Sequence, residues 1–177
     1  MEISEIFSEL SAHMVKGIMV HSQMADYYRF LGLTSYADCH EKRFKEESQE
    51  WRKLCKYYIK HYDRLIEETR IDNPNIIPSE WYKVKRWDVD TNTMRKAVEK
   101  GLDMWVLWET GAKKLYSDTF RRLMDMGEVA TASFIDKILC ETDDELAMAK
   151  SYVQKKRMVN YDAGHIVEEN NVKEINV

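Results

Sequence analysis

Apolar residues recur every three or four positions in long stretches of the chain. The first stretch runs from about residue 4 to 31. Its series is Phe7, Leu10, Met14, Gly17, His21, Met24, Tyr28 and Leu31. This spacing places the series on one face of a helix. Gly32 follows it, and a glycine often takes the left-handed conformation just after a helix end. The pattern therefore predicts a first helix that ends near Leu31.

Three further stretches show the same period. The second helix is expected to start at Ser35, with Asp38 as an approximate capping box. Its series is Phe44, Glu47, Trp51, Leu54, Tyr58, His61 and Leu65. The third is expected to start near Thr93, with the series Val98, Leu102, Trp105, Glu109, Ala112, Tyr116, Thr119 and Leu123. Gly127 separates it from the fourth, whose series is Thr131, Ile135, Ile138, Thr142, Glu145, Ala149 and Tyr152.

The connections between these helices differ in length. Two are short, which favours antiparallel neighbours. The third, from about 70 to 92, contains both prolines, Pro74 and Pro78, and two tryptophans, Trp81 and Trp87. A connection this long needs a structural reason. We expect a crossover along the bundle, held by its apolar residues, that makes the third helix parallel to the second. The pattern thus predicts an all-α four-helix bundle over residues 1–158, with one long crossover between helices 2 and 3. A polar, loosely held tail is expected at 159–177.

Composition narrows the class of protein. The chain has 177 residues, which suits one domain, and a net charge of -4. This charge gives no reason to expect a nucleic acid or an anionic membrane as a partner. The first residues are acidic and lack the apolar region of a signal peptide, and no apolar run is long enough to span a membrane. The cysteines lack metal-type spacing and are odd in number: Cys39, Cys55 and Cys140. We expect a cytoplasmic protein with reduced thiols.

Several charged residues occupy the predicted apolar faces. Glu47, Glu109 and Glu145 each belong to the series of a different helix, and His21 lies on the first helix with His13 nearby. An isolated buried carboxylate is costly, so three near mid-helix suggest a cation, such as a metal pair, between them. Oxygen ligands suit iron, manganese or magnesium. A register error of one residue would instead turn these carboxylates outward, to water or to intrahelical partners such as Lys53 and Lys113. His13 and His21 would then be ordinary core or flank residues.

The acidic residues lie in motifs that resemble a known family. They are Glu46-Glu47-Ser48-Gln49-Glu50, Leu107-Trp108-Glu109, and the stretch from Ser133 to Glu145. Over residues 5 to 157 the chain resembles bacterial ferritins and bacterioferritins. These bind metal through a Glu of the first helix, Glu-Glu-x-x-His of the second, a Glu of the third and a Glu-rich motif of the fourth. The resemblance implies a ferritin-like four-helix bundle with a di-iron carboxylate site. It implies these ligands: Glu47, Glu109, Glu145, Glu50, Glu141 and His13.

Two departures from the family motif leave the function open. Glu50 stands where the family has histidine, and the spacing of the family places the first-helix glutamate at Met14, beside His13. One hypothesis is a ferroxidase-like oxidoreductase that holds two iron ions, or manganese or another divalent metal, and oxidises Fe(II) with oxygen. Iron storage in a homo-oligomeric shell would extend it, and oxidation of another substrate is a variant. The other hypothesis is a bundle with a degenerate or lost metal site and no cofactor, which serves as a structural or interaction module.

Overall fold

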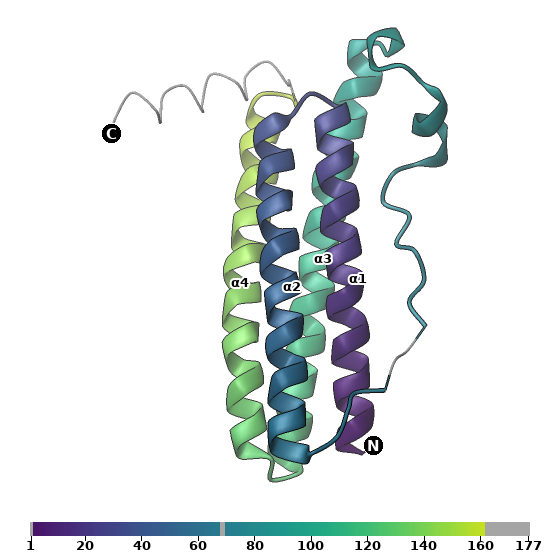
Figure 1. The fold of residues 1–177 in the computed structure, drawn as a ribbon. Helices are drawn as coiled ribbons and strands as arrows, with labels where there is room; N and C mark the ends of the chain where they lie inside the picture. The colour runs from purple at the N-terminus through teal and green to yellow at the C-terminus, as the bar shows by residue number, and fades with distance from the viewer. Residues whose placement is uncertain (1, 68–69, 162–177) are drawn as a thin grey trace, which may run out of the picture. The chain divides into compact units, whose positions relative to one another are not determined.

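The protein is described here by a computed structural model, which covers residues 2–67 and 70–161. Within these ranges the chain forms helices and no strand, which confirms the all-α class. The elements are α1 Ile3–Phe30, α2 Thr34–Tyr62, the 3₁₀ helices η1 Ser79–Lys83 and η2 Arg86–Asp88, α3 Thr91–Asp125, and α4 Val129–Met158 (Figure 1). The chain divides into two compact units at Asp90 and Thr91. Each unit contains one pair of long helices, and the pairs are described separately below.

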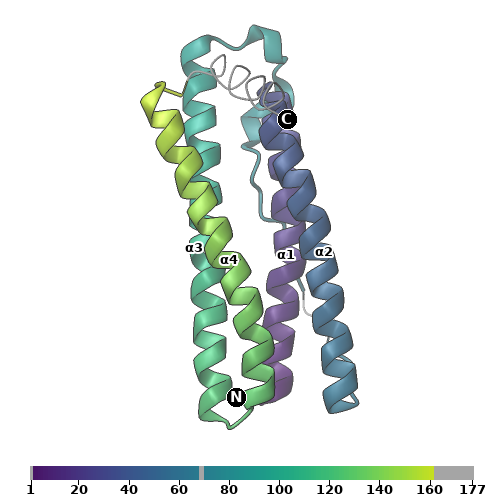
Figure 2. The same cartoon turned by 90° about the vertical axis from the view of Figure 1, so that its left-hand side faces the viewer.

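The first pair consists of α1 and α2, which lie side by side and antiparallel (Figures 1 and 2). The tight turn between them depends on Gly32, whose φ is +80°. The Leu33 N–H donates to the Tyr28 carbonyl at 2.9 Å and the Gly32 N–H donates to Arg29 at 3.1 Å. This is the Schellman arrangement, in which a left-handed glycine satisfies the last carbonyls of a helix. The predicted role of Gly32 is confirmed.

The predicted capping box at the start of α2 is wrong. The helix begins at Thr34, its N-cap is Leu33, and no side chain caps it. The Schellman turn sets this start, because it ends at Leu33, whose side chain is buried. Asp38 forms an ion pair with Arg29 at 3.3 Å instead.

The apolar face of α1 is as predicted, whereas that of α2 is only partly so. All eight members of the α1 series are buried. On α2, Leu54 and Tyr58 are buried, but Phe44 and His61 are exposed, and Leu65 lies beyond the helix end at Tyr62. A strict seven-residue repeat drifts by about 20° per heptad around a straight helix, so a long series cannot keep facing one neighbour. The buried residues near the start of α2 are Tyr36, Ala37 and His40.

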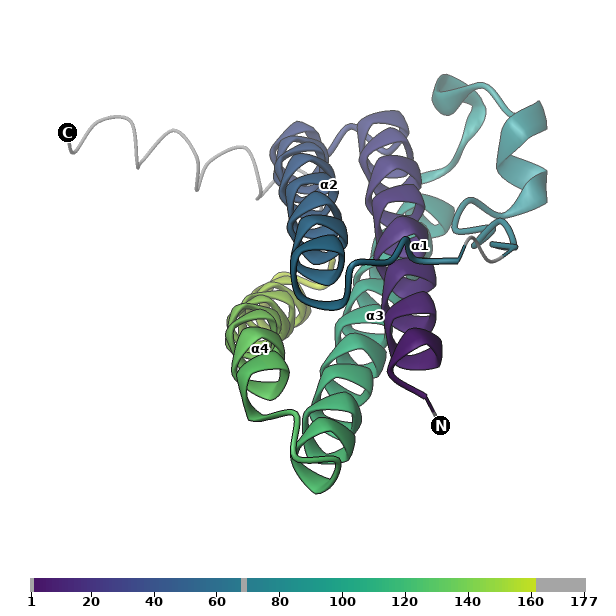
Figure 3. The ribbon, with the colours of Figure 1, turned by 60° about the horizontal axis from the view of Figure 1, so that its bottom comes forward.

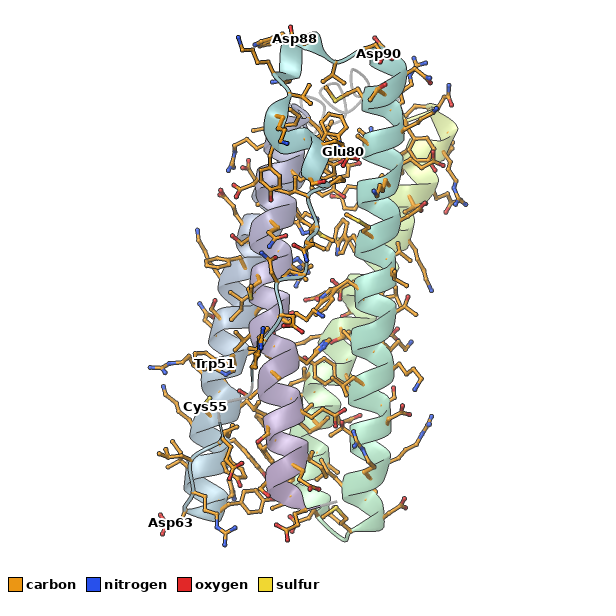
Figure 4. The ribbon with its side chains drawn as sticks, turned by 90° about the vertical axis from the view of Figure 1, so that its right-hand side faces the viewer. Trp51, Cys55, Asp63, Glu80, Asp88 and Asp90 are labelled. Carbon is orange, nitrogen blue, oxygen red and sulfur yellow. The ribbon has the colours of Figure 1, made fainter. Side chains whose placement is uncertain are left out.

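The long connection between α2 and α3, described over residues 63–67 and 70–90, passes along α1 (Figure 4). Trp81 holds it in place, with its ring 6.1 Å from Tyr27 and 5.6 Å from Phe30 between centroids. Gln23 adds two hydrogen bonds, as donor to Asn73 at 2.7 Å and as acceptor from the Ile76 N–H at 2.8 Å. Trp87, by contrast, is 85% exposed. The expectation that apolar residues hold the connection is therefore correct for Trp81 and wrong for Trp87.

The second pair consists of α3 and α4, joined by the short turn seen at the near end of Figure 3. Gly127 has a φ of +77°, and the Glu128 N–H donates to the Leu123 carbonyl at 2.9 Å, so this turn repeats the chemistry of the first. All eight residues of the predicted α3 series are buried, as are all those of α4 except the half-buried Tyr152. The basic last turn of α4 complements the helix dipole.

No helix among residues 2–67 and 70–161 is long and apolar enough to cross a membrane. The predicted tail at 159–177 lies outside the described residues from 162 onward. The division into a bundle at 1–158 and a tail therefore stays a prediction.

Candidate metal-binding residues

On the first pair, the candidate Glu47 lies directly against the backbone of α1. A methyl group built on Gly17 would be 3.1 Å from the Glu47 Cδ and Oε1 atoms. One oxygen of Glu47 is 3.9 Å from His21 Nε2, and the Glu47 side chain is 15% exposed. Because Gly17 has no side chain, the carboxylate can approach the helix closely. On α1, Glu47 therefore contacts Gly17, one turn after the Met14 that family spacing predicts, and lies near His21.

His21 belongs to a buried pair of histidines that joins α1 to α2. Its Nδ1 is 2.9 Å from Nδ1 of His40, and both residues are fully buried. Since one nitrogen must donate and the other accept, the two neutral rings have different tautomers. Burial lowers the pKa of His21 to about 3, with a smaller contribution from Arg43. The pKa of His40 is also lowered well below its ordinary value, first by burial and then by His21 and Arg43. Both rings are therefore uncharged at neutral pH.

His13 and Glu50 lie at the same level of the first pair. The Trp51 indole N–H donates to the Ser11 hydroxyl at 2.9 Å and joins the two helices there (Figure 4 labels Trp51). His13 is two residues from Ser11, and Glu50 is next to Trp51. Both side chains are half-buried. Burial, with a smaller contribution from Lys16, lowers the pKa of His13 to about 4, so this imidazole is uncharged at neutral pH.

On the second pair, Glu109 and Glu145 are both buried. Glu109 is 1% exposed and accepts a hydrogen bond from the Trp105 indole N–H at 3.0 Å. Glu145 is 9% exposed. Two contacts between α3 and α4 fix how far along the pair these carboxylates lie: Trp105 stacks on Tyr152, and Lys113 forms an ion pair with Asp143. Glu109 lies halfway between Trp105 and Lys113 on α3. It is therefore level with the middle of the 143–152 stretch of α4, within one turn of Glu145.

The other candidates of α4 face water or the helix itself. Glu141 is exposed. Thr142 is buried and donates from its hydroxyl to the Ile138 carbonyl at 2.9 Å. Across the described ranges, no three His, Cys, Asp or Glu side chains gather closely enough to hold a metal ion. The carboxylate oxygens are hard donors of the kind that iron prefers.

Sequence reasoning missed two features of this site. It gave His40 no role, and it did not identify Gly17 as the neighbour of Glu47. A signal for the histidine pair does exist. His21 and His40 stand at similar distances on either side of the Gly32 turn, and an antiparallel helical pair brings such residues together.

The Gly17 contact leads to a first prediction. Gly17→Ala should leave the fold intact and change the free energy of unfolding by less than about 1 kcal/mol, because the better helix propensity of alanine offsets the crowding. The Glu47 carboxylate ends a flexible side chain, so it should move rather than the backbone. Urea unfolding measures the stability. Gly111→Ala is the control, since a methyl group there meets nothing within 4 Å. A loss of several kcal/mol in Gly17→Ala alone would show that Glu47 cannot move.

Comparisons with known proteins were made by sequence and by structure. No protein-family model matches the chain, and no curated protein matches its sequence. Solved structures do match. An engineered closed form of the Archaeoglobus fulgidus ferritin aligns with a TM-score of 0.75 at 16% identity, over 97% of this chain and 94% of that one. The open-pore ferritin of the same archaeon gives a TM-score of 0.74 at 16% identity, over 94% and 91%. The Chlorobium tepidum ferritin gives 0.73 at 16% identity, over 98% and 95%.

These likenesses establish the class of the fold, an all-α four-helix bundle with a long second connection. The fold of the chain is therefore like that of the ferritins, and the resemblance inferred from its motifs is confirmed for the fold. At 16–17% identity the comparison concerns the fold alone.

Proposed function

We propose that this protein binds divalent iron through the buried carboxylates of its helices and oxidises it with oxygen. One observation carries the proposal. Glu109 of α3 and Glu145 of α4 are both buried, and their levels along the helical pair differ by less than one turn, in a chain whose fold is like that of the ferritins. A buried carboxylate loses its hydration, and a bound cation is one of the few partners that repays this cost. Iron would be the substrate, and it would supply the electrons that reduce oxygen.

The residues of this chain would have distinct roles. Glu109 and Glu145 would hold the cation, and the Trp105 indole N–H would fix the orientation of the Glu109 carboxylate. Glu47 is the leading candidate on the first pair, where Gly17 and His21 surround its carboxylate. Glu50, His13 and the exposed Glu141 would be secondary ligands. The same oxygen donors would also accept manganese or another hard divalent cation.

A second function is favoured by particular observations. Glu47 lies against Gly17, which has no ligand atom, and Glu109 already accepts a hydrogen bond from Trp105. In this alternative the carboxylates are retained by hydrogen bonds within the protein. The bundle then serves as a structural or interaction module without a metal.

Iron oxidation in air distinguishes the two functions. Fe(II) is added to the purified protein, and ferric products are followed by near-ultraviolet absorbance. We expect Glu47→Ala/Glu109→Ala to lose the protein-dependent rate. Glu41→Ala/Glu99→Ala, which removes two exposed carboxylates from the same helices, should keep it. Equal rates in wild type and both variants, no faster than in buffer, would favour the module.

Iron storage in a homo-oligomer is an extension of the proposal. Sedimentation of the protein, before and after aerobic loading with iron, tests it. An assembly of defined size that retains iron in its own boundary is the expected result. A monomer, with iron sedimenting separately, would contradict storage but not oxidation.

A further inference from the structure

Six consecutive residues of the long connection, 82–87, form an exposed patch that is both aromatic and basic. Its three apolar side chains are between 38% and 85% exposed: Val84, Tyr82 and Trp87. Two exposed lysines alternate with them along the chain, Lys83 and Lys85. Single exposed apolar side chains are ordinary on protein surfaces, but a cluster of them marks a site of interaction. We call residues 82–87 the aromatic-basic patch.

The aromatic-basic patch is attached to the first helical pair at two points. Just before it, Trp81 packs edge-on against Tyr27 of α1, with centroids 6.1 Å apart. Within it, the half-buried Arg86 covers Gly32, where an added methyl group would collide with the guanidinium. The same guanidinium lies over the Trp87 ring, 4.9 Å from its centroid, which is a cation–π contact. Trp87 is therefore exposed yet held in place, so it loses little conformational freedom when it binds.

The charge of the patch is opposite to that of the whole chain. It contains three basic residues, Lys83, Lys85 and Arg86, and no acidic one, whereas the net charge of the chain is -4. Salt screens charges that lie more than about 10 Å away at 0.1 M ionic strength, so a partner in contact with the patch responds mainly to these three cations. The patch therefore suits an anionic partner, although the total charge does not.

The arrangement of the side chains favours a lipid surface over a protein or a nucleic acid. Protein interfaces are depleted of charge at their apolar centre, whereas the lysines here lie between the apolar residues. A nucleic-acid strand follows its binding site over several phosphates, and the exposed carboxylates of Glu80 and Asp88, labelled in Figure 4, would repel them on both sides of the patch. At the surface of a bilayer, tryptophan and tyrosine lie among the headgroups while lysine pairs with anionic lipids.

We propose that the aromatic-basic patch docks the protein on the surface of bilayers that contain anionic lipids. Tyr82 and Trp87 enter the headgroup layer, and Lys83 and Lys85 pair with the lipid phosphates. Arg86 is a positioning residue, because it holds Trp87 against the turn at Gly32. The docking goes beyond the proposed function and does not depend on it, since no metal takes part.

Sedimentation of the full chain with vesicles tests the docking. One set of vesicles is phosphatidylcholine alone, and the other is an equimolar mixture with phosphatidylglycerol. We expect the protein to pellet with the mixed vesicles only, and to be released by high salt. Lys83→Gln/Lys85→Gln should lower the partition coefficient by about 10–30-fold, through the lost attraction of two lysines to anionic lipid. Trp87→Ala should lower it by about 10-fold, through the lost burial of apolar area.

Two controls come from the opposite end of the first helical pair. Lys56→Gln/Lys60→Gln removes the same charge from exposed positions near the end of α2 at Tyr62. Ile59→Ala removes an apolar side chain that is 47% exposed between them. Both control variants should bind the mixed vesicles as the wild type does, because neither alters the patch. All of the changed side chains are exposed, and circular dichroism checks that each variant is folded.

A second measurement follows Trp87 itself. Bromine in the upper acyl chain quenches tryptophan fluorescence only at short range, so brominated mixed vesicles should quench the emission of the bound wild type. Trp87→Phe should still bind but lose most of this quenching, whereas Trp51→Phe, which removes an indole of α2, should keep it.

Several results would overturn the proposal. They are absence of binding to the mixed vesicles, equal binding to both kinds of vesicle, and equal binding by the patch variants and their controls. Quenching that persists in Trp87→Phe would show that another face of the protein meets the lipid. A labelled single-stranded oligonucleotide, followed by fluorescence anisotropy, tests the other polyanion. If it binds through Lys83 and Lys85 while the vesicles do not bind, the patch is a nucleic-acid site and the lipid proposal is wrong.

Discussion

Replacing Trp105 with alanine should lower the free energy of unfolding by about 3–5 kcal/mol. Trp105 is 1% exposed and is the largest fully buried side chain among the described residues. Its ring stacks on Tyr152, with centroids 5.7 Å apart, so truncation leaves a cavity between α3 and α4. It also removes the indole N–H that donates to the buried Glu109. The expected loss therefore combines a packing defect with a carboxylate that has lost a hydrogen bond.

Urea unfolding followed by circular dichroism measures this effect. The control is Trp87→Ala, because Trp87 is 85% exposed and its removal should change stability by no more than about 0.5 kcal/mol. Equal effects of the two substitutions would contradict the packing described here.

Trp105→Phe separates the two contributions, since it keeps a ring and removes the N–H donor. It should cost about 1–3 kcal/mol, part of which should be recovered when Glu109→Leu removes the acceptor as well. Additive losses in the double variant would show that the Trp105–Glu109 hydrogen bond contributes nothing to stability.

Acidification from pH 7 to pH 5 should weaken the fold because of the buried His21 and His40 and the half-buried His13. The folded state lowers the pKa of His21 to about 3 and that of His13 to about 4, and it lowers the pKa of His40 as well. In the unfolded chain each histidine titrates near its ordinary value of about 6.5. Below that pH the unfolded state binds protons that the folded state excludes. Stability is therefore unaffected by these groups above about pH 6.5 and falls as the pH drops below it, by up to about 1.4 kcal/mol per pH unit for each histidine.

The test compares urea midpoints at pH 7, 6 and 5. His21→Leu/His40→Leu removes both members of the buried pair and should reduce the pH dependence to the share of His13, since an apolar pair has no proton to bind. His61→Leu is the control, because His61 is exposed and stacks on Tyr57. A double variant that loses stability with acid as steeply as the wild type would show that the pair does not cause the effect.

How far the sequence predicts this fold depends on how apolar each helix is. The faces of α1 and α3 are predicted residue by residue, because an apolar residue recurs on nearly every turn from one end to the other. The face of α2 is not, because charged residues fill most of the stretch from Glu41 to Lys53 and leave few apolar positions there to define the direction it faces. Its end at Tyr62 and its start at Leu33 depend on tertiary packing and turn geometry, which periodicity does not contain.

For the candidate site, too, the sequence predicts some features and not others. Burial of Glu109 and Glu145 could be predicted, since each occupies the apolar series of its helix. The contact of Glu47 with Gly17 could not, because it depends on the register between α1 and α2, which changes with every residue of the turn. Periodicity indicates on which face of its helix a carboxylate lies, but the distance between two carboxylates on different helices depends on how the helices pack.

Anaerobic titration of the protein with Fe(II), monitored by isothermal titration calorimetry, tests most directly whether the buried carboxylates bind metal. The wild type should show saturable binding, and Glu109→Gln/Glu145→Gln, which keeps the shape of both side chains and removes their charge, should lose it. Binding that is undiminished in this variant, or absent from the wild type, would contradict the proposed function.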